Sequence, residues 1–526
     1  MTKLRKRLVP LLLLLSFVVF PAVSWGIINV TDDLELEGFA QAQNIMRTPN
    51  FRDAEFIMQR NTAQLEGKYY FLRDSQAFGR FATGPLEDAT FSFIARGVYD
   101  AIYDIRDDYS ELNGRSELKL REAFVDFLLP PFTLRLGRQQ IVWGETDNFR
   151  ALDVINPLDL SWHWSREAWE DIRIPLWMAR GIYDIGKLGP FEESFVELIW
   201  IPTDFRRNKI ETNPRRPWAF TGAGLVEVPN SAFVGDQLLG LDIAVRDRIP
   251  GNKLKNGQGG FRFKALWGDI DFSLNYFYGF SADTGARVRT DLTRIEGDTL
   301  HTALDLVNPR SHVVGITANY SEERYTQSVL RLETTFTTGV PVSIATGAPL
   351  RTDPDQDQFD TARRSVVMLG LDRPTWIRPL NRLRTFFIST QFFWRRYLDY
   401  SSYYRGIPSV RRASLGGAAV PGRFISQNTD QLDRDEFVMT FAASTNYGAA
   451  GLLQPQFVFA FDPLSTGAYN QLSLNYLWSD HIVFRAQQHF YWRASGNEPG
   501  PWAIGDIWGG GRNSRHETVF SVIFQF

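Results

Sequence analysis

Cysteine is absent from all 526 residues of the chain. This absence excludes disulfide bonds, thiolate nucleophiles and metal sites built from cysteine ligands. An exported protein without disulfides needs another source of stability, and a large closed β-sheet supplies one.

Long hydrophobic runs are nearly absent as well. A helical membrane protein carries repeated apolar runs of about 20 residues. This chain has one long run, residues 8–20, which is short for a bilayer span and contains Pro10. Basic residues precede the run and small residues follow it: Lys3, Arg5, Lys6, Arg7, then Ala22, Ser24 and Gly26. This order predicts a secretory signal peptide over residues 1–26 and a mature chain of residues 27–526, with an N-terminal anchor helix as the alternative.

An excess of positive charge is also lacking. The formal net charge is −3, and removal of the basic leader makes the mature chain more acidic. A nucleic-acid partner requires a strongly basic face. We therefore expect no nucleic-acid partner.

Motifs for catalysis and cofactor binding are missing too. The sequence has no Gly-x-Ser-x-Gly, His-Glu-x-x-His or P-loop pattern. Asp353, Asp355 and Asp357 are spaced like the start of a calcium loop, but Gln358 and Arg364 replace the Gly and Glu that such a loop requires. We therefore expect no catalytic residues, no cofactor, no metal site and no enzymatic activity.

Aromatic residues and alternating segments are what the sequence has in abundance. Aromatics make up 14% of the residues, yet the mean hydropathy is only −0.23. Apolar and polar residues alternate with the period of a β-strand, as where Phe272, Leu274 and Tyr276 alternate with Ser273 and Asn275. Strands often end on Tyr or Trp, which suits a membrane–water interface, and the opposite faces are polar enough for a wet lumen.

The alternating segments predict a closed antiparallel transmembrane β-barrel of about 16 to 18 strands. There are nineteen candidate segments, of which we expect one or two not to be barrel strands: residues 34–45, 56–71, 90–103, 117–128, 132–142, 177–185, 195–201, 238–245, 260–267, 270–278, 312–320, 330–336, 366–372, 386–394, 436–447, 456–462, 472–478, 483–492 and 517–526. Short turns are expected at 267–269 and 462–467, and long loops at 206–236, 281–310, 339–364, 401–435 and 495–515. Short turns that alternate with long loops are typical of outer-membrane barrels, whose short turns face the periplasm.

The last ten residues carry the closing strand. Thr518, Phe520, Val522, Phe524 and Phe526 fall on one face, and the chain ends on the aromatic Phe526. In a closed barrel this strand pairs with the first and its apolar face meets lipid. The segment resembles the C-terminal strand of bacterial outer-membrane barrels, and this resemblance implies that the insertion machinery reads Phe526.

Residues 144–175, which we call the 144–175 segment, break the alternation. The segment combines clustered charges with closely spaced tryptophans and carries a signal for a short helix after Ser165. We expect it to fold into the lumen or cap a mouth of the barrel. The candidate constriction residues in and just before it are Arg138, Glu145, Asp147, Arg150, Asp153, Asp159, Trp162, Trp164 and Trp169.

Two interpretations of these residues stay open. The charged residues either set a transverse field that selects cargo or form a salt-bridge network that holds the segment against the wall. The tryptophans either bind an aromatic or acyl ligand or anchor the segment.

Four motifs in order carry a resemblance to a known family: Leu136-Gly-Arg-Gln139, Trp143-Gly-Glu145, Asn156-Pro-Leu-Asp159 and Ile174-Pro-Leu-Trp177. They resemble an uncharacterised family of proteobacterial outer-membrane barrels. The resemblance implies a porin-like protein of the Gram-negative outer membrane. It also implies an association with hydrophobe-exporting pumps of the RND superfamily and with a periplasmic or lipoprotein partner.

We therefore expect an outer-membrane channel or transporter component for a hydrophobic, lipid-like or other small solute. One alternative is a non-conducting outer-membrane scaffold that docks a periplasmic partner or a pump. A second alternative is a barrel hydrolase that uses His163 or His489.

Overall fold

The computed structural model describes residues 28–48, 54–107, 109, 115–147, 149–161, 168–210, 231–234, 237–344, 359–405, 432–464, 467–493 and 516–526. The predicted signal peptide, Trp162, His163 and Trp164 lie outside these residues, as do most of the expected loops 206–236, 401–435 and 495–515. No helix in the described part of the chain combines the length and the apolarity that crossing a membrane demands.

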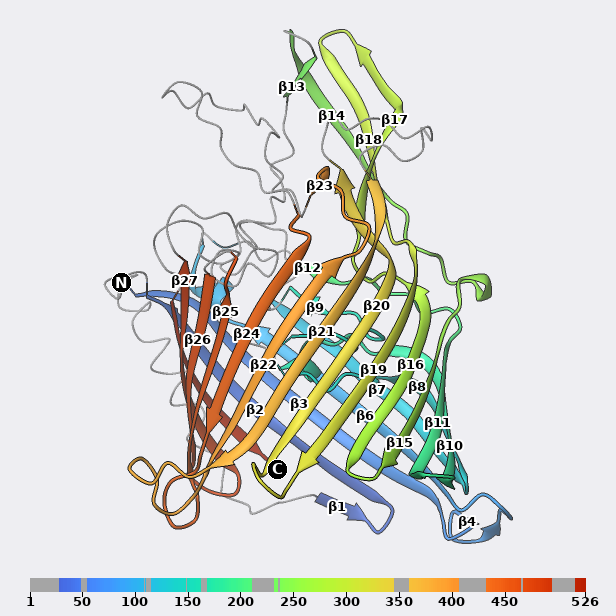
Figure 1. Cartoon of the computed structure of the whole chain (residues 1–526), viewed down its shortest axis with the longest axis vertical. Coiled ribbons are helices and arrows are strands. Elements are labelled where there is room, and N and C mark those ends of the chain that lie inside the picture. Colours follow the sequence, from blue (N-terminus) through green and yellow to red (C-terminus); the bar gives the residue numbers. More distant parts are fainter. Residues whose placement is uncertain are drawn as a thin grey trace.

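Eighteen strands of the described chain pair in sequence order and close into an antiparallel barrel (Figure 1). The first nine are β2 (Leu34–Arg47), β3 (Glu55–Arg73), β6 (Asp88–Asp100), β7 (Ser116–Leu129), β8 (Phe132–Gln139), β10 (Leu176–Leu188), β11 (Phe191–Ile201), β15 (Gln258–Trp267) and β16 (Ile270–Phe280). The others are β19 (Arg310–Glu322), β20 (Ser328–Ile344), β21 (Phe359–Thr375), β22 (Phe386–Tyr397), β24 (Asp435–Ser444), β25 (Leu453–Asp462), β26 (Gly467–Leu477), β27 (Ile482–Arg493) and β28 (Glu517–Gln525). The predicted fold class is confirmed.

Short accessory elements extend this framework. Strands β1 (Ile28–Thr31), β4 (Gln76–Ala77), β5 (Phe81–Ala82) and β23 (Tyr404–Arg405) add to the barrel sheet, and β9 (Asp159–Leu160) pairs with β12 (Lys209–Ile210). The helical turns are α2 (Ile102–Ile105), α3 (Trp169–Ile172) and η2 (Leu254–Asn256).

The first and last barrel strands close the sheet. Strand β28 pairs with β2 from Glu517 to Gln525, and Phe526 continues the ladder through two backbone hydrogen bonds with Gly38, of 2.8 and 2.9 Å. An added Cβ on Gly38 would lie 2.3 Å from the Gln64 carbonyl oxygen and 3.0 Å from the Phe526 ring. Glycine therefore allows the close approach of three strands at the closure.

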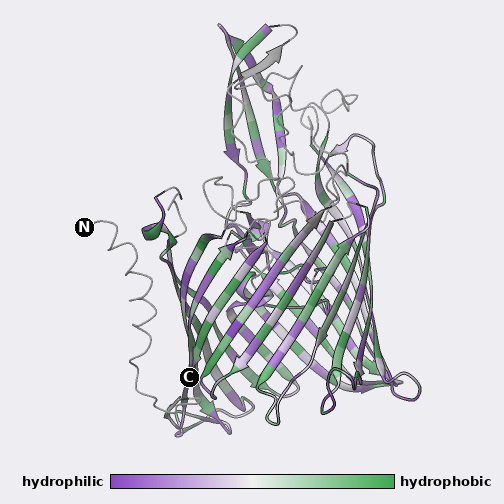
Figure 2. Cartoon of the chain, turned by 90° about the vertical axis from the view of Figure 1, so that its left-hand side faces the viewer, coloured by the Kyte–Doolittle hydropathy of each residue, from purple (hydrophilic) through white to green (hydrophobic). Residues whose placement is uncertain are grey.

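Hydrophobic and hydrophilic residues alternate along the barrel strands, which gives the green and purple bands of Figure 2. On β16, Leu274 and Tyr276 are exposed on the outer face, whereas Ser273 and Asn275 are buried toward the lumen. The same order holds on β27, where Phe484 is exposed and His489 is buried. The alternation predicted from the sequence is thus confirmed for these strands.

The two rims of the barrel differ in their connections. Short turns such as 268–269 share one rim with the C-terminus, and the longer connections lie at the other rim (Figure 1). The turn after β25, predicted as the same kind of turn as 267–269, lies instead at the long-loop rim, because β25 runs away from the rim where β15 ends.

A four-stranded sheet, the extension sheet, projects beyond the long-loop rim (Figure 1). It contains β13 (Ser231–Val234), β14 (Gln237–Asp247), β17 (Gly285–Glu296) and β18 (Thr299–Val307), with β14 and β18 parallel. The prediction of a loop over 281–310 is therefore wrong, and the predicted strand 238–245 belongs to this sheet rather than to the barrel. Its strands are largely solvated and Arg-rich, so the apolar face that marks a strand in sequence is weak there. The expected loop 339–364 is also shorter, because β20 continues to Ile344 and β21 begins at Phe359.

Candidate lumenal site

The 144–175 segment leaves the barrel wall after β8, folds inside the barrel and returns at β10 (Figure 1). The buried Asn156 fixes the start and end of this path. Its side-chain oxygen accepts a hydrogen bond from the Ile141 amide at 2.8 Å, and its amide nitrogen donates to the Ile174 carbonyl at 2.9 Å. Because each of these backbone groups would otherwise be buried without a partner, one asparagine stabilises both ends of the segment.

An apolar cluster anchors the first half of the segment to the wall. Trp143, Leu152 and Ile155 pack with Phe277 of β16 and Val313 of β19. Trp143 meets Phe277 edge to face, with ring centroids 6.5 Å apart.

Glycines in the wall make room for this cluster. A Cβ on Gly315 would lie 2.1 Å from Leu152 Cδ1, and one on Gly260 would lie 2.5 Å from Trp143 Cη2. Glycine at these two wall positions therefore leaves the space that the Leu152 and Trp143 side chains fill.

Glu333 of β20 binds the backbone of the segment at both ends of the turn between Glu145 and Leu152. Its carboxylate accepts a hydrogen bond from the Glu145 amide at 2.7 Å and a second from the Leu152 amide. Glu333 is fully buried. A carboxylate that accepts two backbone amides holds the turn firmly, since charge-assisted hydrogen bonds are the stronger ones.

Asp147 and Glu145, both predicted constriction residues, are bound to strands across the lumen. The Asp147 carboxylate lies 2.5 Å from Arg331 Nη2 and accepts a 2.8 Å hydrogen bond from Gln391. The Glu145 carboxylate accepts a hydrogen bond from Asn319 and lies 3.6 Å from Lys264 Nζ. The segment thus joins β8 and β10 to β15, β19, β20 and β22.

Arg150 and Asp153 are paired within the segment. Asp153 is 4% exposed and its carboxylate lies 3.2 Å from Arg150 Nε and 2.8 Å from Arg173 Nε. Two cations around one buried carboxylate satisfy the requirement that a buried charge be paired.

Of the other predicted residues, Asp159 lies apart from this group and Trp169 contacts it. Asp159 forms an ion pair with Lys209 at 3.1 Å beside the β9–β12 pair. The Trp169 indole donates a 2.7 Å hydrogen bond to the Asp147 carbonyl, which anchors α3 to the segment. Trp162 and Trp164 are outside the described residues.

Arg138 does not join the group in the lumen. It is in register with Ala123 of β7 and Trp177 of β10, and Trp177 is half exposed on the outer wall. Its neighbour Gln139 is fully buried and points inward, where it donates to the Met178 carbonyl. Because consecutive strand residues face opposite sides, the placement of Arg138 in the lumen is wrong.

A second inward fold occupies the mouth next to β2 and β3. Ile102 and Tyr103 of α2 pack on Ile45, Ile57 and Val519, all buried. The apolar Val519, which departs from the polar face of the last strand, is thus explained by its contact with α2.

Beside the 144–175 segment remains a cavity of about 400 Å³, which we call the lumenal cavity. One side is formed by the segment, through Phe149, Trp169 and Ile172. The other side is the wall of β2, β3, β6, β7, β25, β26 and β27. Four arginines reach the cavity from that wall: Arg60, Arg96, Arg121 and Arg485.

The sequence did not single out these wall residues. Glu333, Arg331 and the four arginines stand on strands far along the chain from the segment, and only their place on the polar face of each alternation marks them. The alternation predicts that these side chains face the lumen, but it does not predict which residues they contact.

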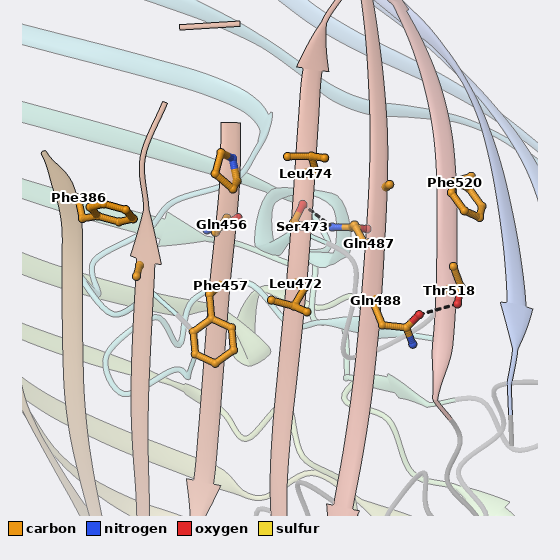
Figure 3. Close-up of a pocket in the computed structure, with 13 residues that line it drawn as sticks. Phe386, Gln456, Phe457, Leu472, Ser473, Leu474, Gln487, Gln488, Thr518 and Phe520 are labelled. Atoms are coloured by element: carbon orange, nitrogen blue, oxygen red, sulfur yellow. Dashed lines mark hydrogen bonds between the residues drawn. The ribbon is translucent and has the colours of Figure 1, made fainter. Parts of the chain in front are cut away.

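A shallow groove also lies in the wall where β24 to β28 run side by side (Figure 3). Its lining is mostly apolar, with Phe457, Leu472 and Phe520, and includes a 2.6 Å hydrogen bond from Thr518 to Gln488. Leu472 and Phe520 are exposed on the outer face. The groove therefore lies outside the lumenal cavity.

Similar proteins were found among solved structures and among family models. OccAB4 and OccAB1 of Acinetobacter baumannii are 9% and 10% identical to the chain, each over 95% of this chain and over 99% and 98% of theirs, with TM-scores of 0.45. The outer membrane protein opdK of Pseudomonas aeruginosa is 8% identical over 93% of this chain and 98% of its own, with a TM-score of 0.43. No curated protein matches the sequence. The family described as protein of unknown function DUF1302 matches residues 62–492, and the chain belongs to that family.

Proposed function

We propose that this protein is an outer-membrane channel through which a small solute passes beside the 144–175 segment. The observation that carries the proposal is the lumenal cavity of about 400 Å³ between the segment and the wall. The segment is held to the opposite strands by ion pairs and hydrogen bonds, so it narrows the lumen as a fixed part rather than as a loose loop.

The outer surface supports a location in a membrane. Large apolar side chains are exposed around the barrel, among them Leu65, Phe91, Leu198, Leu274, Leu330, Leu369, Leu472 and Phe520. Aromatic side chains are exposed toward both rims, with Tyr99, Trp177 and Trp200 at one and Trp267 and Trp478 at the other. A closed barrel with an apolar band between aromatic girdles is suited to the outer membrane of Gram-negative bacteria.

The position of His489 favours a channel over a hydrolase. This histidine, the described candidate for a hydrolase, is fully buried, and its Nδ1 lies 2.7 Å from the Tyr469 hydroxyl. A fully buried imidazole is not accessible to a substrate in the lumen.

Deletion of residues 147–169 tests the channel. Removal of the constriction should raise single-channel conductance in a planar bilayer by about twofold or more, because the lumen widens. Barrel assembly should be retained, since all eighteen barrel strands remain and only the short β9 is lost. The matched control is Glu296→Gln at the exposed tip of β17, which should leave conductance unchanged. Unchanged conductance in the deletion variant would contradict a constriction by the segment.

A non-conducting scaffold is the second candidate, and its partner would meet the rim of short turns, because short turns face the periplasm and the extension sheet lies at the opposite rim. In that case the protein would dock a lipoprotein or periplasmic partner, or an RND-type pump, and conduct nothing. Membranes that retain unaltered permeability after loss of the protein, together with capture of such a partner, would favour the scaffold.

A further inference from the structure

The arginines of the lumenal cavity are confined to one part of the wall. Arg60, Arg96 and Arg121 come from the consecutive strands β3, β6 and β7, and Arg485 comes from β27. Strands β27, β28, β2 and β3 are neighbours in the closed sheet. The four arginines therefore share one continuous arc of the wall, the arginine arc. It lies across the lumen from β15, β19, β20 and β22, which bind Glu145 and Asp147.

The carboxylates that reach the same cavity are already paired. Glu117 lies 2.5 Å from Lys119 Nζ, Asp147 lies 2.5 Å from Arg331 Nη2, and Asp171 is bound by Arg96. Each of these three carboxylates is thus paired with a cation. Two of the cations, Lys119 and Arg331, do not belong to the arginine arc.

Two arginines of the arc have neutral hydrogen-bond partners. Arg121 donates to the Glu170 and Arg173 carbonyls at 2.8 and 2.9 Å, and Arg485 donates to the Asn475 amide oxygen at 2.8 Å. Among the described residues, neither forms an ion pair. Their charge is therefore left to attract an anion into the cavity, and low-dielectric walls strengthen that attraction.

Basic residues elsewhere in the lumen differ in this respect. On the opposite side Arg180 is paired with Glu197 at 2.7 Å, and Arg331 is paired with Asp147 and with Asp372 at 3.0 Å. Arg395 is paired with Glu436. Arg121 and Arg485 differ from these three arginines, because no carboxylate among the described residues forms an ion pair with either of them.

The rest of the cavity lining combines glutamines of the wall, such as Gln41 and Gln471, with apolar side chains. Phe149, Trp169 and Ile172 project from the segment, and Val458 and Ala460 project from β25. A solute whose charged group meets the arginines has apolar side chains around the rest of its body.

We propose that the lumenal cavity selects organic anions with an apolar body, such as aromatic carboxylates. Guanidinium groups bind the carboxylate through planar paired hydrogen bonds, and the aromatic and aliphatic side chains of the segment and of β25 contact the apolar part. This inference rests on the proposed channel and specifies its substrate class.

Ion selectivity in planar bilayers is the first test. In a potassium chloride gradient the wild-type channel should be anion-selective. Arg485→Gln should lower the chloride-to-potassium permeability ratio by about twofold or more, whereas Arg485→Lys should retain it. Arg324→Gln removes the same charge from an exposed turn outside the cavity and should change nothing.

Block of the current by small probes is the second test. Benzoate should block the wild-type channel at a lower concentration than acetate, which lacks the apolar body, and than benzylammonium, which has the opposite charge. Phe149→Ala should weaken block by benzoate while the ion selectivity stays.

The outcomes separate the two proposals. A conducting protein that prefers cations, or that benzoate blocks no better than benzylammonium, overturns the substrate class and leaves the channel standing. A reconstituted protein that conducts nothing overturns both. The wild-type measurements decide the matter even if a variant fails to assemble.

Discussion

At the scale of the residue, one carboxylate joins two parts of the chain that are nearly 190 positions apart. Glu333 lies on β20 and accepts hydrogen bonds from the Glu145 and Leu152 amides, at sequence separations of 188 and 181. Glu145 itself is bound by Asn319. The turn of the 144–175 segment therefore depends on single side chains of the opposite wall.

Substitution Glu333→Ala should release this turn. Loss of two charge-assisted hydrogen bonds to buried amides should lower the free energy of local opening of this turn by about 2–3 kcal/mol. Hydrogen exchange at the Glu145 and Leu152 amides should then accelerate by roughly 30- to 150-fold, since each 1.4 kcal/mol corresponds to a factor of ten. Glu333→Gln keeps one acceptor oxygen and should give an intermediate rate. Wild-type exchange in the alanine variant would show that Glu333 does not hold the turn.

At the scale of the element, the extension sheet contains a charged cluster that joins three of its strands. Asp305 of β18 is 4% exposed. Its carboxylate lies 2.6 Å from Arg246 Nε, 3.4 Å from Arg248 Nε and 3.3 Å from Arg289 Nη1. Arginines from β14 and β17 thus meet on the strand between them.

This cluster should make the extension sheet sensitive to acid. Burial raises the pKa of Asp305, but hydrogen bonds from Arg246 and Arg289 outweigh it and hold the pKa below its ordinary value of 3.8. A lowered pKa in the folded state stabilises the sheet above the ordinary pKa, and this stability is lost as pH falls through the lowered value. Hydrogen exchange of β14, β17 and β18, corrected for its intrinsic pH dependence, should therefore stay slow down to about pH 4 and accelerate below it.

Asp305→Asn gives the matched comparison. Exchange in the extension sheet should already be fast at neutral pH in this variant, because the charge that binds the arginines is gone, while exchange in the barrel strands stays slow. An extension sheet that keeps its protection in the variant would show that the cluster does not hold it.

At the scale of the whole molecule, Phe526 takes part in the closure of the barrel. Phe526 extends the β28–β2 ladder through the backbone of Gly38. Its ring lies against the space that a Cβ on Gly38 would take. The C-terminal residue is thus a structural part of the seam as well as the predicted signal for the insertion machinery.

Phe526→Ala should separate these two roles. The variant retains both backbone hydrogen bonds, so refolding into detergent micelles, followed by heat-modified migration in gels, should resemble the wild type. Assembly in cells should fall several-fold if the insertion machinery reads the aromatic ring. Phe524→Ala, which removes an exposed aromatic of the same face, is the control and should assemble normally. Equal assembly of both variants would contradict a recognition role for Phe526.

The sequence alone determined the class of fold, because the period of two is local and each strand carries it independently. The alternation of Leu274 and Tyr276 with Ser273 and Asn275 identified the two faces without any knowledge of neighbours. The same logic failed in the extension sheet, where both faces of β17 are largely solvated, and at Arg138, where strand alternation places an arginine on the outer wall.

Tertiary structure alone decided which charges are compensated. Asp147 is paired with Arg331 at a separation of 184 residues, whereas Arg485 donates to the Asn475 amide oxygen and forms no ion pair among the described residues. Nothing local in the sequence distinguishes these two arginines, since both stand on the polar face of an alternating strand. Pairing depends on how the closed sheet surrounds the 144–175 segment, which gives Arg331 and Arg96 a carboxylate partner and gives Arg121 only carbonyl partners among the described residues.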